Sequence, residues 1–115
     1  MKSMALSILS LVFLLGASIA YAHPPSDIII TYDAATKTLT AEIKHSVSNP
    51  VQHYIKKVDI GLNGKEIAEL KFKKQDSFFS QDITYTFTDI KPKDTLSVEA
   101  YCSISGKLKK EIKAE

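Results

Sequence analysis

Residues 38–45 read Thr-Leu-Thr-Ala-Glu-Ile-Lys-His, in which apolar and polar side chains alternate from one residue to the next. Leu39, Ala41 and Ile43 share one face of an extended chain, because successive side chains of a β-strand point to opposite sides. This two-residue period is typical of a strand with one buried face and one solvated face. His45 continues the apolar parity, so we expect its side chain to lie where the buried face of the strand ends.

The same alternation recurs along the rest of the chain, with turn residues between the runs. We expect strands at residues 27–32, 38–45, 54–62, 66–73, 81–88, 95–104 and 108–113. The pair Asn63-Gly64 predicts a tight hairpin turn, because both residues accept the positive φ that such turns require. Seven short strands at regular spacing predict an all-β fold, a seven-stranded immunoglobulin-like antiparallel β-sandwich.

The first 22 residues have a different character. Lys2 precedes an apolar run over residues 5–20, and Ala20-Tyr21-Ala22 has the small-x-small pattern of a cleavage site. We therefore expect a secretory signal peptide at residues 1–22 and a single β-sandwich domain at residues 23–115. The apolar run is shorter than the roughly 20 residues of a spanning helix, so no stable membrane anchor is expected. The protein is expected to be secreted or periplasmic.

The charge composition excludes some functions. The chain has 15 Lys and Arg residues, all of them lysine, against 13 Asp and Glu residues, and its formal net charge is +2. Nucleic-acid recognition favours arginine, whose planar guanidinium binds phosphates and bases with two hydrogen bonds. A nearly balanced surface without arginine therefore argues against nucleic acid as a partner.

Histidine and cysteine are the scarce residues of this sequence. There are three histidines, His23, His45 and His53, and one cysteine, Cys102, so no internal disulfide can form. Imidazole suits iron, copper and zinc, and a thiolate adds negative charge to such a site. His45 ends the second expected strand, His53 opens the third, and Cys102 lies near the end of the sixth. We expect these four residues to meet at one end of the sandwich and to bind a metal, with iron as the first choice.

The residues that carry this chemistry resemble a known family. Residues 45–60, with His53-Tyr54-Ile55 at their centre, and residues 101–106, Tyr-Cys-Ser-Ile-Ser-Gly, resemble the superoxide reductases and the iron-binding domain of desulfoferrodoxin. The resemblance implies a seven-strand sandwich with a mononuclear Fe2+/Fe3+ site of histidine nitrogens and one axial cysteine sulfur. His23, His45, His53 and Cys102 would be the ligands. The ligand set is incomplete, since Ser105 stands where the family has its C-terminal histidine ligand.

Three functions remain open on this sequence. The first is an exported iron protein that reduces superoxide, or binds another small anion, with an external electron donor. The second is a periplasmic copper-binding module, in which cleavage after Ala22 gives His23 a free amine beside its imidazole. The third is a metal-free interaction domain that uses Phe78-Phe79 as an exposed anchor.

Overall fold

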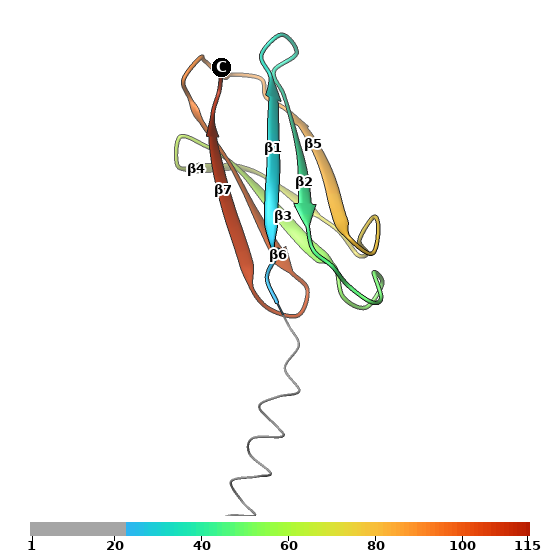
Figure 1. Cartoon of the computed structure of the whole chain (residues 1–115). Helices are drawn as coiled ribbons and strands as arrows, with labels where there is room; N and C mark the ends of the chain where they lie inside the picture. Colours follow the sequence, from blue (N-terminus) through green and yellow to red (C-terminus); the bar gives the residue numbers. More distant parts are fainter. Residues whose placement is uncertain (1–22) are drawn as a thin grey trace, which may run out of the picture.

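Seven β-strands make up most of residues 23–115, the part of the chain that the computed structural model describes (Figure 1). The strands are β1 (Asp27–Asp33), β2 (Thr38–Lys44), β3 (Ile55–Leu62), β4 (Lys65–Lys71), β5 (Ser80–Thr86), β6 (Thr95–Cys102) and β7 (Lys107–Lys113). Within residues 23–115 there is no helix that is long and apolar enough to cross a membrane. The predicted signal peptide at residues 1–22 lies outside the described residues.

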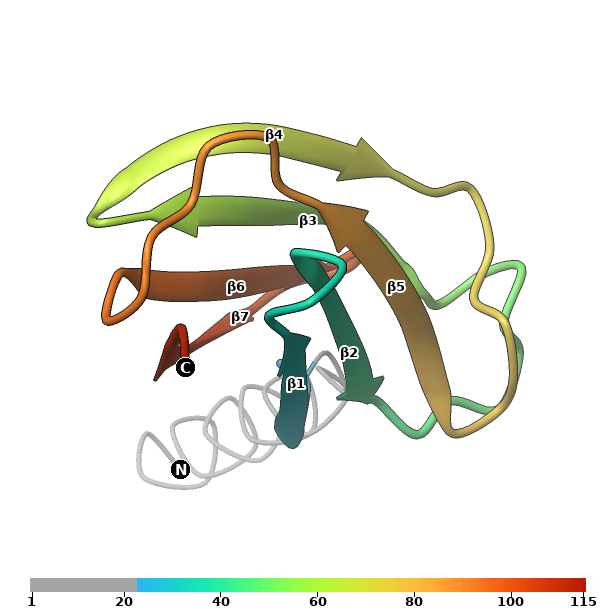
Figure 2. The same ribbon diagram turned by 90° about the horizontal axis from the view of Figure 1, so that it is seen from above.

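The strands form two antiparallel sheets that face each other (Figure 2). One sheet has the order β1-β2-β5 and the other the order β4-β3-β6-β7. The pairs β2–β5 and β3–β6 join strands that are not neighbours in sequence, so the chain crosses between the sheets as an immunoglobulin-like sandwich does. The predicted all-β, seven-stranded sandwich is confirmed, and each predicted strand agrees with an observed one to within two residues at either end.

The core lies between the sheets and is built from the alternating apolar residues. Leu39, Ile43 and Ile60 are fully buried, as their parity predicts. The strand predicted at residues 95–104 ends two residues early: β6 ends at Cys102, and Ile104, which continues its apolar alternation, is 57% exposed in the following turn.

Two local features set the register of β3, a hairpin turn after its last residue and an irregularity near its first. Asn63 (φ 52°) and Gly64 (φ 83°) both have positive φ in the turn between β3 and β4, which confirms the predicted hairpin. The pairing of β3 with β6 shifts between Ile55 and Lys57, so that Ile55 lies opposite Cys102. This irregularity lets β3 begin beside the end of β6, with both residues buried.

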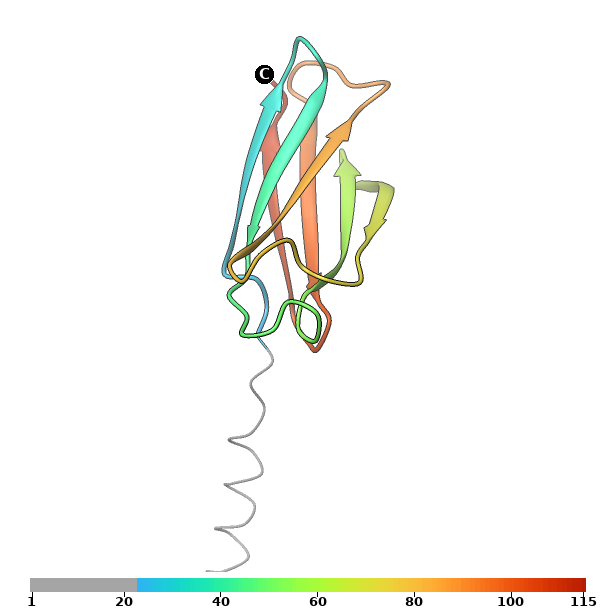
Figure 3. The same ribbon diagram turned by 90° about the vertical axis from the view of Figure 1, so that its right-hand side faces the viewer.

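Antiparallel pairing gathers particular strand ends at one pole of the sandwich. The starts of β1, β3, β5 and β7 and the ends of β2, β4 and β6 lie together at the lower end of the molecule in Figures 1 and 3. The β2–β3, β4–β5 and β6–β7 loops meet there with the segment before β1. We call this end the site pole.

Candidate metal centre

The four candidate ligands all lie at the site pole. His23 precedes β1, His45 directly follows β2, His53 lies two residues before β3, and Cys102 is the last residue of β6. Each occupies a position at which antiparallel topology brings the chain to the same pole. The fold therefore brings together residues that are as far apart in sequence as His23 and Cys102.

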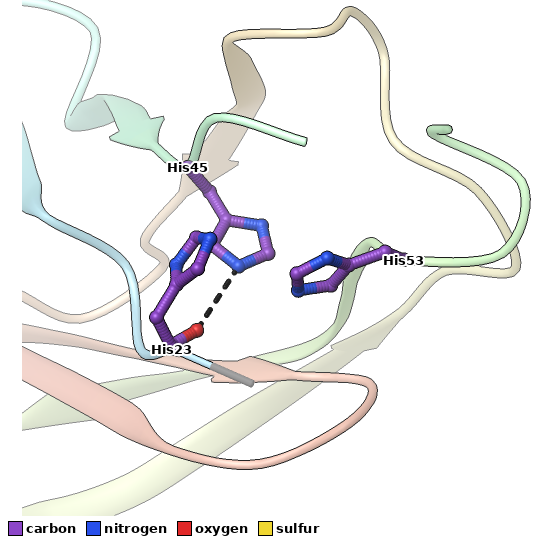
Figure 4. A group of neighbouring side chains, drawn as sticks. All are labelled: His23, His45 and His53. Carbon is purple, nitrogen blue, oxygen red and sulfur yellow. Dashed lines mark hydrogen bonds between the residues drawn. The ribbon is translucent and has the colours of Figure 1, made fainter. Parts of the chain in front are cut away.

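The three histidine rings converge in space (Figure 4). Their ring centroids are 4.9 Å apart for His23 and His45, 5.1 Å for His23 and His53, and 4.8 Å for His45 and His53. One nitrogen from each ring lies within 4.8 Å of the other two. His45 is buried, His53 half-buried and His23 exposed, so the cluster opens to solvent on the side of His23.

Cys102 joins this cluster through His53. The Cys102 Sγ atom lies 3.1 Å from His53 Nε2. The backbone N–H of Ile104 also points at the sulfur, with an N–S distance of 3.4 Å. The three histidines could hold a metal ion, and Cys102 lies beside His53 as a further candidate ligand.

The loop that carries His53 is fixed by its own hydrogen bonds. The backbone N–H groups of Gln52 and His53 both donate to the Asn49 carbonyl, and the Asn49 side chain accepts from Val51 N. After His53, Tyr54 is tied to Ser103 in both directions: Ser103 N donates to the Tyr54 carbonyl, and Tyr54 N donates to Ser103 Oγ. These bonds hold the His53 backbone against the residue that follows Cys102.

His45 is held on three sides. Its backbone N–H donates to the Phe79 carbonyl, and its Nδ1 lies 2.8 Å from Oε1 of the buried Gln75. Its Nε2 lies 3.3 Å from the His23 carbonyl oxygen, the contact that is dashed in Figure 4. Gln75 was not among the residues expected at the site. It lies in the polar β4–β5 loop, and no pattern in the sequence distinguishes it.

The surroundings of His53 lower its pKa. Burial lowers the pKa of His53, and positive charge on His45 and His23 lowers that pKa further. A histidine with a lowered pKa stays neutral down to a lower pH. Only the neutral ring has a lone pair for a metal. The lowered pKa of His53 thus suits its role as a candidate metal ligand.

Ser105, the residue that stands in place of the family's fourth histidine, lies exposed in the β6–β7 turn. The neighbouring Gly106 has φ +91°, and its Cα faces the Pro24 backbone so closely that a Cβ there would lie 2.8 Å from Pro24 N. The segment that carries His23 is therefore packed directly on this turn. Glycine is required at position 106 both for the positive φ and for the close approach.

A second group of close carboxylates is found away from the site pole. Asp59, Glu66 and Glu69 bring one oxygen each within 4.8 Å of one another on β3 and β4. Lys57 Nζ lies 3.6 Å from carboxylate oxygens of both Asp59 and Glu69. The Lys57 ammonium group lies against two of the three carboxylates, and we assign no metal to them.

The fold and the cluster together define a small β-sandwich protein with a candidate metal centre at one pole. No family model matches this chain, and no curated protein matches it. Similar solved structures do exist. A hypothetical protein from Pyrococcus horikoshii OT3 superposes with a TM-score of 0.59 and 16% identity, over 83% of this chain and 91% of that one.

Two further similar structures are named superoxide reductases. One, in the oxidised state, has a TM-score of 0.57 and 14% identity over 83% of this chain and 92% of its own. The other, a neelaredoxin from Ignicoccus hospitalis, has a TM-score of 0.50 and 21% identity over 81% of each chain. At these identities the likeness establishes the fold. The chain has the superoxide-reductase type of β-sandwich, which confirms that part of the resemblance found in the sequence.

Proposed function

We propose that residues 23–115 form an exported mononuclear iron-binding domain of the superoxide-reductase type, with His23, His45, His53 and Cys102 as the iron ligands. One observation carries the proposal. Three histidine rings converge at the site pole, and the Cys102 sulfur lies 3.1 Å from His53 Nε2. The fold shared with superoxide reductases supports iron as the metal.

Each side chain has a separate task in this proposal. Bound iron would supply a one-electron redox couple. The Cys102 sulfur, which accepts from the Ile104 N–H, would contribute the negative charge that favours the oxidised metal once it is bound as a ligand. His45 and His53 place their nitrogens on the buried side, and the exposed His23 leaves the solvent side accessible to a small anion.

The proposed reaction is the reduction of superoxide. Superoxide takes up one electron and two protons to give hydrogen peroxide, so each turnover needs one electron from outside the substrate. A chain with a single cysteine has no four-cysteine iron site to store that electron. The proposal therefore includes an external one-electron donor protein.

The test is spectroscopic. The domain beginning at His23 is loaded with Fe(II) without oxygen and then oxidised. We expect one iron per chain and a visible ferric-thiolate charge-transfer band. In Cys102→Ser the band should be absent while iron is still bound by the histidines, and in His53→Gln the iron affinity should fall. Iron binding without the band in the unmodified chain would remove Cys102 from the ligand set.

Copper is the second candidate, and it is favoured by the position of His23. This residue directly follows the predicted cleavage site, and its ring belongs to the histidine cluster. An N-terminal amine and the imidazole of the same residue can chelate copper, with His45 or His53 completing the site. One alanine inserted before His23 should abolish copper binding by this route and leave iron binding by the imidazoles unchanged.

A domain without metal is the remaining candidate. Phe78 and Phe79 are 55% and 72% exposed in the β4–β5 loop, where they could contact a protein partner. Failure to bind stoichiometric iron or copper, with the cluster intact, would favour this function over the other two.

A further inference from the structure

Gln75 uses every polar atom of its side chain inside the site pole. Its Nε2 donates to the carbonyl oxygens of His45, at 2.7 Å, and of Ser77, at 3.0 Å. Its Oε1 lies 2.8 Å from His45 Nδ1, and its backbone N–H donates to the Pro50 carbonyl at 2.9 Å. The residue is buried, and these bonds connect the β4–β5 loop to the β2–β3 loop at His45 and at Pro50.

These bonds fix which way the carboxamide points. Both hydrogens of Nε2 are directed at carbonyl oxygens, which can only accept. The atom that faces His45 is therefore Oε1, which also can only accept. It follows that His45 Nδ1 is the donor and carries the proton. The His23 carbonyl oxygen, 3.3 Å from Nε2, also can only accept, so Nε2 could donate to it only in the doubly protonated ring; in the neutral ring this contact is not a hydrogen bond, and the lone pair is on Nε2.

We propose that Gln75 is a positioning residue of the metal centre, which holds His45 in the Nδ1–H tautomer and directs its Nε2 toward the ion. This inference rests on the proposed metal site. The histidine rings converge with His45 Nε2 beside the His23 carbonyl, so this nitrogen lies within the cluster, and Nδ1 faces the protein interior. A metal-bound histidine commonly donates its other N–H to such a partner, and loss of the partner weakens metal binding.

The chain offers a matched control for Gln75. Gln81 at the start of β5 is equally buried, and its carboxamide is also fully bonded: Nε2 donates to Asp76 Oδ2 and to the Asp82 carbonyl, and Oε1 accepts from Asp76 N. Gln81 has no hydrogen bond to a histidine. Replacement of either glutamine by methionine removes a buried amide of the same size, and of the two only Gln75 is hydrogen-bonded to His45.

The experiment has two readouts. Nitrogen-15 NMR of the metal-free domain above pH 8 reports the tautomer of His45, and chelator competition with Fe(II) under anaerobic conditions reports affinity. We expect the Nδ1–H tautomer in the unmodified chain and in Gln81→Met, and a mixture of tautomers in Gln75→Met. We expect Gln75→Met to bind Fe(II) about 10- to 100-fold more weakly than Gln81→Met.

The outcomes separate the two proposals. A proton on Nε2 of His45 in the unmodified domain would overturn the positioning role without any use of metal. Equal Fe(II) affinity in Gln75→Met and Gln81→Met, with binding intact in the unmodified chain, would overturn the positioning role alone. Absence of Fe(II) binding in the unmodified chain would overturn the proposed function, and the positioning role with it.

Discussion

Replacing Gly106 by alanine should weaken metal binding by displacing the backbone that carries His23. A Cβ at position 106 would lie 2.8 Å from Pro24 N and 3.0 Å from Pro24 Cα, whereas ordinary contacts begin at 3.4 Å. The Pro24 nitrogen must therefore retreat by about 0.6 Å, the difference between 3.4 and 2.8 Å. That nitrogen is bonded to the carbonyl carbon of His23, and metal–ligand distances tolerate only about 0.2 Å. We expect a loss of Fe(II) affinity on the order of 10- to 100-fold.

Gly64 provides the control. Its φ is +83°, close to the +91° of Gly106, but an added Cβ there would meet nothing within 4 Å. Gly64→Ala and Gly106→Ala both place a side chain in the left-handed region, which costs about 1–2 kcal/mol of folding free energy. Both variants should therefore lose stability in urea unfolding, and Gly106→Ala should lose more because of its overlap with Pro24. Only Gly106→Ala should lose metal affinity.

The assay is anaerobic competition of a chelator for Fe(II), carried out with and without the His23 side chain. In a His23→Ala background, Gly106→Ala should cause no further loss of affinity, because the ligand it displaces is already gone. Equal affinity in Gly106→Ala and Gly64→Ala would refute the reasoning. It would mean that the contact between the β6–β7 turn and Pro24 does not place His23 at the metal.

Three other predictions concern the scaffold. Leu39→Ala, in the fully buried core, should lower the free energy of unfolding of the metal-free domain in urea by about 2–5 kcal/mol. A decrease below about 1 kcal/mol would show that the core around position 39 closes up without leaving a cavity. Gly61→Ala places a Cβ against the Ser97 hydroxyl, so it should lower the unfolding midpoint, and Ser97→Ala in the same chain should restore most of the loss. Tyr101 donates to Glu99, which raises the pKa of the phenol to about 12. The stability that this bond contributes is fully present below the ordinary pKa of 10 and is lost as the pH rises toward 12, and Glu99→Gln should lower the tyrosine midpoint in an ultraviolet titration.

The strands and their buried faces can be predicted from the sequence, because apolar and polar residues alternate within each strand. The alternation of Leu39, Ala41 and Ile43 specifies which face is buried, and the same parity places His45 at the end of that face. In the structure His45 is 1% exposed, as expected for a side chain of that parity. The Asn63-Gly64 turn likewise depends on two adjacent residues. Features of this kind are local, so they can be read from a single segment.

The contacts within the site could not be read in this way. Gln75 lies thirty residues from His45 in sequence, and the hydrogen bonds between them exist only because the β4–β5 loop folds back on the end of β2. The approach of Gly106 to Pro24 likewise joins the turn before the last strand to the segment before the first. Glycine in a turn predicts positive φ, but it does not reveal what packs against it.

The candidate ligands come from both sheets and from the segment before β1, and this determines when they can meet during folding. Cys102 ends a strand in one sheet, and His45 follows a strand in the other, so the two approach each other only after the sheets have packed. His23 is different, because it precedes β1 and reaches the cluster through Pro24 and the β6–β7 turn. We therefore expect the sandwich to fold without metal and to hold His45, His53 and Cys102 in place. Bound metal would then add about 2.7 kcal/mol of stability at a free metal concentration 100 times the Kd, because it binds the folded chain and not the unfolded one.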